Sequence, residues 1–175
     1  MIVLRQLIPS DVCLACDGCC RFAQNPSVWS PLFLFEEIRE LTQKGIVPSC
    51  VFSHTGGSGR HAARIDLAAD GDHFICSCFD AAGAKCKIYL FRPLDCQIYP
   101  FLLARHEAQA VLAVDAKCPY IREHLEDALT REYIVYLKKF LLSQAFKDMA
   151  AREPRIFQEY PSDYDVVAVL PGFNF

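Results

Sequence analysis

The chain has 175 residues, of which 53% are hydrophobic and 22% are charged, and its formal net charge at pH 7 is −3. A chain of this length and composition can bury a core of its own, which excludes intrinsic disorder and a need for disulfide bonds to hold the fold together. The scattered Lys and Arg residues exclude the basic surface by which proteins bind nucleic acid.

The hydrophobic residues do not form a membrane segment. No apolar run reaches the roughly 18 residues of a spanning helix, and the apolar stretch in Met1–Pro9 is too short for a secretory signal. We therefore expect a cytoplasmic protein without a membrane partner. In a reducing compartment, ten cysteines are more typical of metal ligands or redox centres than of structural disulfides.

The first third of the chain predicts a strand, a helix and a loop. Residues Met1–Leu7 fit a short strand. A helix is predicted to begin at Ser30-Pro31 and to end at Gly45. The apolar face of this helix is formed by Phe35, Ile38 and Leu41. The glycine-rich segment Thr55–Arg60 is predicted to be a flexible loop.

Two β-hairpins are predicted in the middle of the chain. The first joins Ala63–Leu67 to His73–Cys78 through Asp70-Gly71-Asp72, a strong turn signal. The second joins Phe101–Arg105 to Ala110–Val114. The first hairpin carries two cysteines on its second strand.

The last third predicts helices and a tail. Helical spacing continues from Ile121 to Ala150, and a break near Thr130 suggests two helices. Residues Val166–Leu170 are expected to add an edge strand or to pack as a cover. The predicted fold is a small single α+β domain with short β-hairpins, a cysteine-rich metal-binding core and a C-terminal helical region. It would cover residues 1–153, with residues 154–175 as an extended tail.

Four cysteines lie within eight residues, in the sequence CLACDGCC. They are Cys13, Cys16, Cys19 and Cys20. Two residues between cysteines let the chain turn so that both sulfurs reach one metal ion, at about 2.3 Å for zinc. Gly18 favours a turn over a regular helix, and both geometries bring the thiols together. Because zinc and iron–sulfur clusters both take four thiolates, the spacing alone leaves the metal open.

A second cysteine-rich stretch reads CSCFDAAGAKCKIYLFRPLDCQIYPF. Its most specific positions are Cys86, Ile88, Tyr89, Arg92, Pro93, Cys96, Tyr99 and Pro100. Together with the first run and with Cys118-Pro119, this order resembles the YkgJ-type zinc- or iron-chelating proteins. The resemblance extends from Cys13 to Pro119.

The resemblance implies metal chelation by about eight cysteines. The expected ligands are Cys13, Cys16, Cys19, Cys20, Cys78, Cys86, Cys96 and Cys118. Eight thiolates match two four-thiolate sites, or one cluster with spare ligands. We expect an iron–sulfur cluster, of the 4Fe–4S type, in an electron-transfer protein or oxidoreductase that meets a redox protein partner. The alternative is a zinc-binding structural or partner-binding module without catalytic activity, and a thiol–disulfide oxidoreductase is a third hypothesis.

The sequence allows more than one ligand assignment at some cysteines. Cys76 competes with Cys78 as a ligand, and we prefer Cys78 because Phe79 follows it and because of its distance to Cys86. Cys50 has no motif and is expected to be a structural or incidental thiol.

The sequence also departs from the family at two places. The family usually has Cys-Arg where this chain has Cys96-Gln97, and Pro-Gly where it has Pro119-Tyr120. Arg92 is expected to bind the cofactor by hydrogen bonding to a thiolate sulfur, with a plain salt bridge as the alternative.

Overall fold

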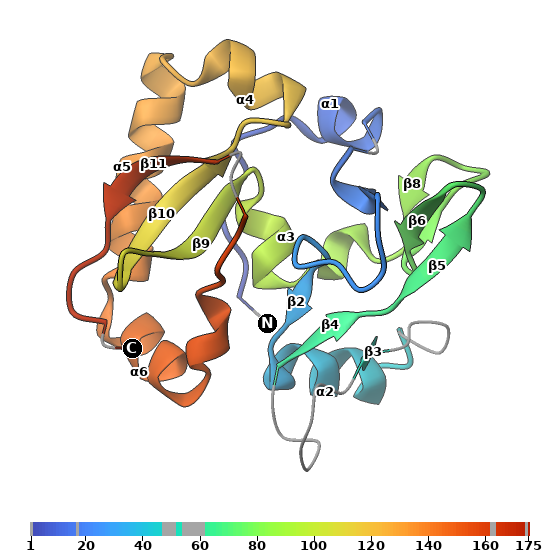
Figure 1. Ribbon diagram of the computed structural model, residues 1–175, viewed down its shortest axis with the longest axis horizontal. Coiled ribbons are helices and arrows are strands. Elements are labelled where there is room, and N and C mark those ends of the chain that lie inside the picture. Colours follow the sequence, from blue (N-terminus) through green and yellow to red (C-terminus); the bar gives the residue numbers. More distant parts are fainter. Residues whose placement is uncertain (1, 17, 47–51, 54–61, 162–163, 174) are drawn as a thin grey trace. The chain divides into compact units, whose positions relative to one another are not determined.

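The computed structural model describes residues 2–16, 18–46, 52–53, 62–161, 164–173 and 175. It has mixed α+β structure with small antiparallel sheets and C-terminal helices, which confirms the predicted fold class (Figure 1). The chain forms two compact units, Met1–Gln97 and Ile98–Phe175. The division into a domain of residues 1–153 and a tail stays a prediction.

The first unit consists of short elements. Its helices are α1 (Ser10–Leu14), η1 (Gly18–Cys20), α2 (Phe35–Gln43), η2 (Tyr89–Phe91) and α3, whose range is Leu94–Ile98. Its strands are β1 (Arg21–Phe22), β2 (Leu32–Phe33), β3 (Phe52–Ser53), β4 (Ala63–Ile65), β5 (Leu67–Asp70), β6 (His73–Cys76), β7 (Phe79–Asp80) and β8 (Lys85–Cys86). They form three antiparallel sheets, in the orders β1-β6-β5, β2-β4-β3 and β7-β8.

The core of the first unit contains cysteines among its apolar side chains. Phe33, Leu41 and Ile65 are almost completely buried there. Cys76 and Cys78 belong to the same buried cluster, and Cys20 and Cys86 pack against it. The hydrophobic core of this unit therefore forms one wall of the region in which the thiols lie.

The predicted hairpin at Asp70-Gly71-Asp72 is confirmed. Strands β5 and β6 pair in an antiparallel ladder, in which Leu67 lies opposite Cys76 at one end and Asp70 lies opposite His73 at the other. Gly71 has a φ of +61°, a conformation that glycine adopts without the steric cost of a Cβ atom. The second strand ends at Cys76, so Cys78 lies beyond it.

Helix α2 is confirmed, but its predicted start is wrong by four residues. Leu32 and Phe33 form β2 instead, because they pair with Arg64 and Ala63 of β4. A pairing partner thirty residues away is invisible to a local helix-start signal. The Thr55–Arg60 loop and Cys50 lie outside the described residues.

The predicted strand at Met1–Leu7 is wrong over its described residues, which have no regular secondary structure. The Leu4 N–H donates a hydrogen bond of 3.0 Å to Gln97 Oε1, and Gln97 Nε2 donates one of 2.8 Å to the Ile2 carbonyl. The Gln97 amide thus satisfies backbone groups that a neighbouring strand would otherwise pair.

Over its described residues, 98–161, 164–173 and 175, the second unit has one sheet and three α-helices. Strands β9 (Phe101–His106), β10 (Gln109–Asp115) and β11 (Tyr164–Val169) form an antiparallel sheet in the order β11-β10-β9. The helices are α4 (Pro119–His124), α5 (Ala128–Leu141) and α6 (Gln144–Arg152), followed by the short η3 (Pro154–Ile156). Helix α5 packs along the sheet, where the rings of Tyr133 and Phe101 are 5.7 Å apart (Figure 1).

Sequence patterns predicted this unit well. The hairpin β9–β10 is confirmed, and β11 is the edge strand that was one of the two alternatives for the tail. The helical region is also confirmed, but Thr130 lies buried inside α5. The breaks in the helical region fall at residues 125–127 and 142–143 instead.

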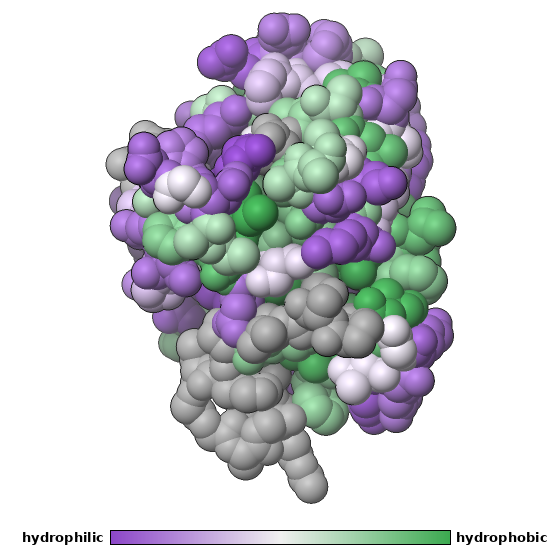
Figure 2. Space-filling model, turned by 90° about the vertical axis from the view of Figure 1, so that its right-hand side faces the viewer, coloured by the Kyte–Doolittle hydropathy of each residue, from purple (hydrophilic) through white to green (hydrophobic). Residues whose placement is uncertain are grey.

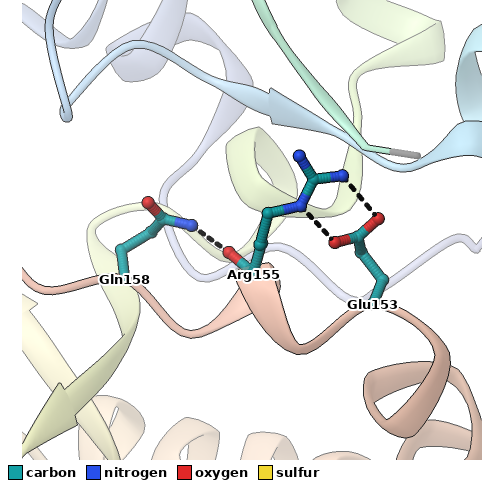
Figure 3. Close-up of polar contacts among 3 residues, drawn as sticks. All are labelled: Glu153, Arg155 and Gln158. Carbon is teal, nitrogen blue, oxygen red and sulfur yellow. Dashed lines mark hydrogen bonds and ion pairs between the residues drawn. The ribbon is translucent and has the colours of Figure 1, made fainter. Parts of the chain in front are cut away.

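A small polar network closes α6. The guanidinium of Arg155 donates to both carboxylate oxygens of Glu153, at 2.7 and 3.1 Å, and Gln158 Nε2 donates to the Arg155 carbonyl (Figure 3). A two-bond Arg–carboxylate pair fixes the geometry of both side chains. It therefore holds the turn between α6 and the segment that leads to β11.

The molecular surface mixes polar and apolar residues. On the face drawn in Figure 2, hydrophobic areas are interspersed with hydrophilic ones. None of the helices over the described ranges has the length and apolar character required to cross a lipid bilayer.

Candidate metal centre

Seven of the eight predicted cysteine ligands belong to the first unit, and they come from several elements. Cys13 lies on α1 and Cys16 follows it, while Cys19 and Cys20 lie on η1. The later ones are Cys78, which follows β6, Cys86, which ends β8, and Cys96, which lies on α3. The N-terminal run is thus a short α-helix followed by a 3₁₀ turn, which is more regular than the turn that Gly18 suggested.

Cys19 is the common neighbour of five other thiols. It interacts electrostatically with Cys13, Cys20, Cys76, Cys86 and Cys96. Three of these five, Cys76, Cys86 and Cys96, are more than fifty residues from it in sequence. The fold therefore gathers six free thiols, Cys19 included, from four separate segments of the first unit.

Burial favours the protonated form of the thiols that surround Cys19. Burial raises the pKa of Cys76 to about 11, with further increases from Cys86 and Cys19. Burial also raises the pKa values of Cys13, Cys86 and Cys96, and their neighbouring cysteines add to the effect. Metal binding must therefore displace protons from these sulfurs. A thiol–disulfide oxidoreductase needs the opposite shift, a lowered thiol pKa.

Arg92 places positive charge beside the thiols. Arg92 Nη1 lies 3.9 Å from Cys13 Sγ, within the distance of a hydrogen bond to sulfur, and Arg92 Nε donates to the Tyr89 carbonyl at 3.1 Å. The Arg92 guanidinium also lowers the pKa values of Cys13 and Cys86. This is the geometry expected for a side chain that supports bound thiolates from outside the ligand set.

Two carboxylates hold the helix that carries Cys96. Glu37 Oε1 accepts a hydrogen bond of 2.7 Å from the N–H of Leu94, the first residue of α3. Asp95 Oδ2 accepts one of 2.9 Å from the Leu32 N–H in β2. A carboxylate of α2 thus binds the backbone of α3, and a carboxylate of α3 binds the backbone of β2. These two hydrogen bonds fix α3 against α2 and β2.

Sequence reasoning missed both carboxylates. Glu37 lies in the first turn of α2, where acidic residues are usually exposed and interact with the helix dipole. Here it is only 4% exposed. The one local signal was its position three residues after Leu34, whose N–H it binds through its second oxygen at 2.9 Å.

Cys76 and Cys78 have different states. Cys78 is disulfide-bonded, whereas Cys76 is a buried free thiol that interacts electrostatically with Cys86 and Cys19. Of the two, only Cys76 has a free thiol among the neighbours of Cys19, whereas the preference drawn from sequence was for Cys78.

Two further predicted ligands have distinct surroundings. Cys16 is an exposed free thiol. Cys118 is a buried free thiol of the second unit, at the start of α4. Its N–H donates to the Asp115 carbonyl at 3.2 Å, and the Asp115 carboxylate accepts hydrogen bonds from Lys117 N and Tyr99 Oη.

The gathered thiols are neighbours rather than a formed coordination shell. In the part of the chain that the structure describes, no three His, Cys, Asp or Glu side chains meet in an arrangement able to hold a metal ion. The electrostatic neighbourhood of Cys19 is thus the geometric basis for the candidate centre.

Comparison with known proteins identifies the type of domain. The family model CxxCxxCC, "Putative zinc- or iron-chelating domain", matches residues 12–119. The chain belongs to this CxxCxxCC family. No curated protein and no solved structure gives a match. The match covers the N-terminal cysteine run and continues to Pro119, as the resemblance predicted.

The family to which the CxxCxxCC protein belongs is one of cysteine-rich domains that chelate zinc or iron. The residues fit such a function, because thiolates are preferred ligands of both zinc and iron–sulfur clusters. Five free thiols are electrostatic neighbours of Cys19, and Arg92 supplies positive charge beside Cys13. The family and the chemistry of the side chains therefore agree on metal binding.

Proposed function

We propose that this CxxCxxCC protein holds an iron–sulfur cluster, of the 4Fe–4S type, and that it acts in electron transfer or as an oxidoreductase with a redox protein partner. The observation that carries the proposal is the position of Cys19, which interacts electrostatically with five other thiols. When bound, a cluster would accept and donate single electrons.

The proposed ligands come from the thiols around Cys19. They are Cys13, Cys19, Cys20, Cys76, Cys86 and Cys96, and we propose Cys16 and Cys118 as further ligands. In this set Cys76 takes the position that the sequence assigned to Cys78. A single closed zinc site takes four thiolates. A 4Fe–4S cluster also takes four, so the larger number available here supports more than one metal centre, or one centre with spare ligands.

The chain's own residues would prepare the site in three ways. The apolar cluster around Cys76 limits the access of water to the sulfurs. Arg92 compensates part of the negative charge of the thiolates. This reduces the repulsion between the sulfurs and so favours their binding to one metal centre. Glu37 and Asp95 fix the helix that presents Cys96.

The decisive experiment is elemental analysis of protein purified without oxygen, combined with a visible spectrum. We expect bound iron, acid-labile sulfide and the broad charge-transfer absorption of a cluster. Cys19→Ala should remove most of the iron and sulfide, whereas Cys78→Ala should retain them. Stoichiometric zinc without sulfide would overturn the cluster and support the alternative.

That alternative is a zinc-binding module with a structural or partner-binding role and no catalytic activity. It is favoured by the protection of most of the thiols, since structural zinc sites are closed by protein ligands. Cys76 is buried and Cys13, Cys19, Cys20, Cys86 and Cys96 are half-buried. Protein that contains neither iron nor zinc would contradict both functions.

A further inference from the structure

The sulfur of Cys13 receives hydrogen bonds from two side chains of one short segment. Arg92 Nη1 lies 3.9 Å from Cys13 Sγ. Tyr89 also forms a hydrogen bond to this thiol, and both contacts lower its pKa against the effects of burial and of Cys19. Arg92 and Tyr89 therefore act on the same sulfur atom.

The Tyr89 hydroxyl is oriented by a residue near the N-terminus. Gln6 Nε2 donates a hydrogen bond of 2.8 Å to Tyr89 Oη. A phenol has one hydrogen to donate and accepts through its oxygen. Because Gln6 occupies the accepting side, the hydroxyl hydrogen is directed to another acceptor, and the Cys13 sulfur is the one that it meets.

Arg92 and Tyr89 also support each other. The guanidinium carbon of Arg92 lies 4.0 Å from the centre of the Tyr89 ring, and Arg92 Nε donates to the Tyr89 carbonyl at 3.1 Å. A cation over an aromatic ring is attracted by the ring's quadrupole. The two donors to Cys13 are thus fixed as one unit.

We infer that Tyr89 is a positioning residue of the metal centre, which donates a hydrogen bond to the Cys13 ligand, and that Gln6 orients its hydroxyl. The inference rests on the proposed function, since Cys13 must be a ligand. Hydrogen bonds to a ligating sulfur withdraw electron density from it, which stabilises the thiolate and raises the reduction potential of a bound cluster.

Cys13 differs in this respect from other thiols of the site. Cys76 and Cys86 accept hydrogen bonds from the backbone N–H groups of Cys78 and Ile88. A backbone donor is present whatever the side chain, whereas the donors to Cys13 depend on two side-chain identities. The electronic properties of the centre can therefore be changed at Tyr89 without altering a ligand.

The test is cobalt(II) binding to the full-length, metal-free protein under anaerobic conditions. Tyr89→Phe retains the ring beneath Arg92 and removes only the hydroxyl. We expect cobalt affinity to fall by about 10- to 100-fold, the range typical of groups that hydrogen-bond to ligands. The thiolate-to-cobalt charge-transfer band should also move to lower energy, because the sulfur becomes more electron-rich.

Two other variants make the result specific. Gln6→Leu should shift the band in the same direction by a smaller amount, and Gln6 is exposed, so this variant should fold even if Tyr89→Phe does not. Tyr164→Phe is the matched control, because its hydroxyl lies 3.0 Å from His106 Nδ1 in the second unit. It should leave both the affinity and the band unchanged.

The outcomes separate the inference from the proposed function. Normal cobalt binding with an unshifted band in both Tyr89→Phe and Gln6→Leu would overturn the role of Tyr89 and leave the metal centre intact. A wild-type protein that binds neither cobalt, zinc nor iron would overturn the proposed function itself. In a protein that carries a cluster, Tyr89→Phe should lower the reduction potential relative to Tyr164→Phe.

Discussion

Glu37 Oε1 accepts a hydrogen bond of 2.7 Å from the backbone N–H of Leu94, which joins α2 to the first residue of the helix that carries Cys96. The second oxygen of Glu37 accepts from Leu34 N at 2.9 Å. One buried carboxylate thus satisfies donors at the starts of two helices. Unpaired buried N–H groups are costly, so this side chain should be important for stability.

The raised pKa of Glu37 should make the stability of the protein depend on pH. Burial raises its pKa from 4.5 to about 7, against the lowering effect of its two backbone hydrogen bonds. The folded state therefore binds a proton more tightly than the unfolded state. Stability should rise as the pH falls from 7 to 4.5, by up to about 3 kcal/mol, and fall as the pH increases through 7. Urea unfolding at several pH values measures this contribution.

Glu37→Gln should flatten that pH dependence and lower stability at pH 5 by about 1–3 kcal/mol, because one N–H loses its acceptor. Glu36→Gln is the control, since Glu36 lies beside it on α2 but its side chain is 67% exposed. The control should change stability by less than about 0.5 kcal/mol. Equal effects of the two substitutions would refute the role of Glu37.

The choice between Cys76 and Cys78 can be decided by a pair of substitutions. Cys76→Ala should weaken zinc binding by more than the roughly 10- to 100-fold typical of residues that only contact a ligand. Cys78→Ala should retain zinc affinity and lower stability, because it removes both a disulfide bond and a side chain that is 1% exposed in the core. Competition with a coloured chelator measures both affinities. The reverse order of effects would restore the assignment made from sequence.

Metal removal should destabilise the protein, because the bound metal ion no longer links the cysteines of the folded state. At a free zinc concentration of 100 times Kd, binding to the folded state alone adds about 2.7 kcal/mol. For a chain of this length that corresponds to a rise in Tm of about 5–10 °C. Thermal unfolding monitored by circular dichroism, with and without chelator, tests it. Cys19→Ala should abolish the difference, and a persistent shift in that variant would argue against the site.

The second unit should depend on its apolar core. Leu137 lies on α5 with no exposed surface, so Leu137→Ala should cost about 2–5 kcal/mol of stability. Val135, on the same helix, is 67% exposed, and Val135→Ala should have little effect. Denaturant unfolding of the two variants compares them directly. Similar losses would show that α5 does not pack as described.

The sequence predicted those parts of the fold whose signals are local. The turn at Asp70-Gly71-Asp72 identified one hairpin, and two short apolar segments on either side of residues 106–109 identified the strands β9 and β10. The start of α2 was mispredicted because β2 depends on pairing with β4, which no local pattern encodes. The strand expected at the N-terminus has its backbone groups satisfied by Gln97 instead.

The same distinction applies to the metal centre. The spacing of Cys13, Cys19 and Cys20 indicated a shared site, because close cysteines are brought together by any compact turn. The buried carboxylate of Glu37 could not be inferred, since its sequence context is that of an ordinary exposed helix residue. Cys76 and Cys78 are two residues apart, and their different states, a free thiol at the end of β6 and a disulfide-bonded cysteine beyond it, do not follow from their local sequence.

The amide of Gln97 has an evolutionary consequence. It accepts from Leu4 N and donates to the carbonyls of Ile2 and Arg92, which requires a side chain with both kinds of polar atom. Arginine, which the family resemblance leads us to expect at this position, has donors only. A homologue with arginine at this position must therefore route its first residues differently, and changes at position 97 and in the N-terminal segment should co-vary.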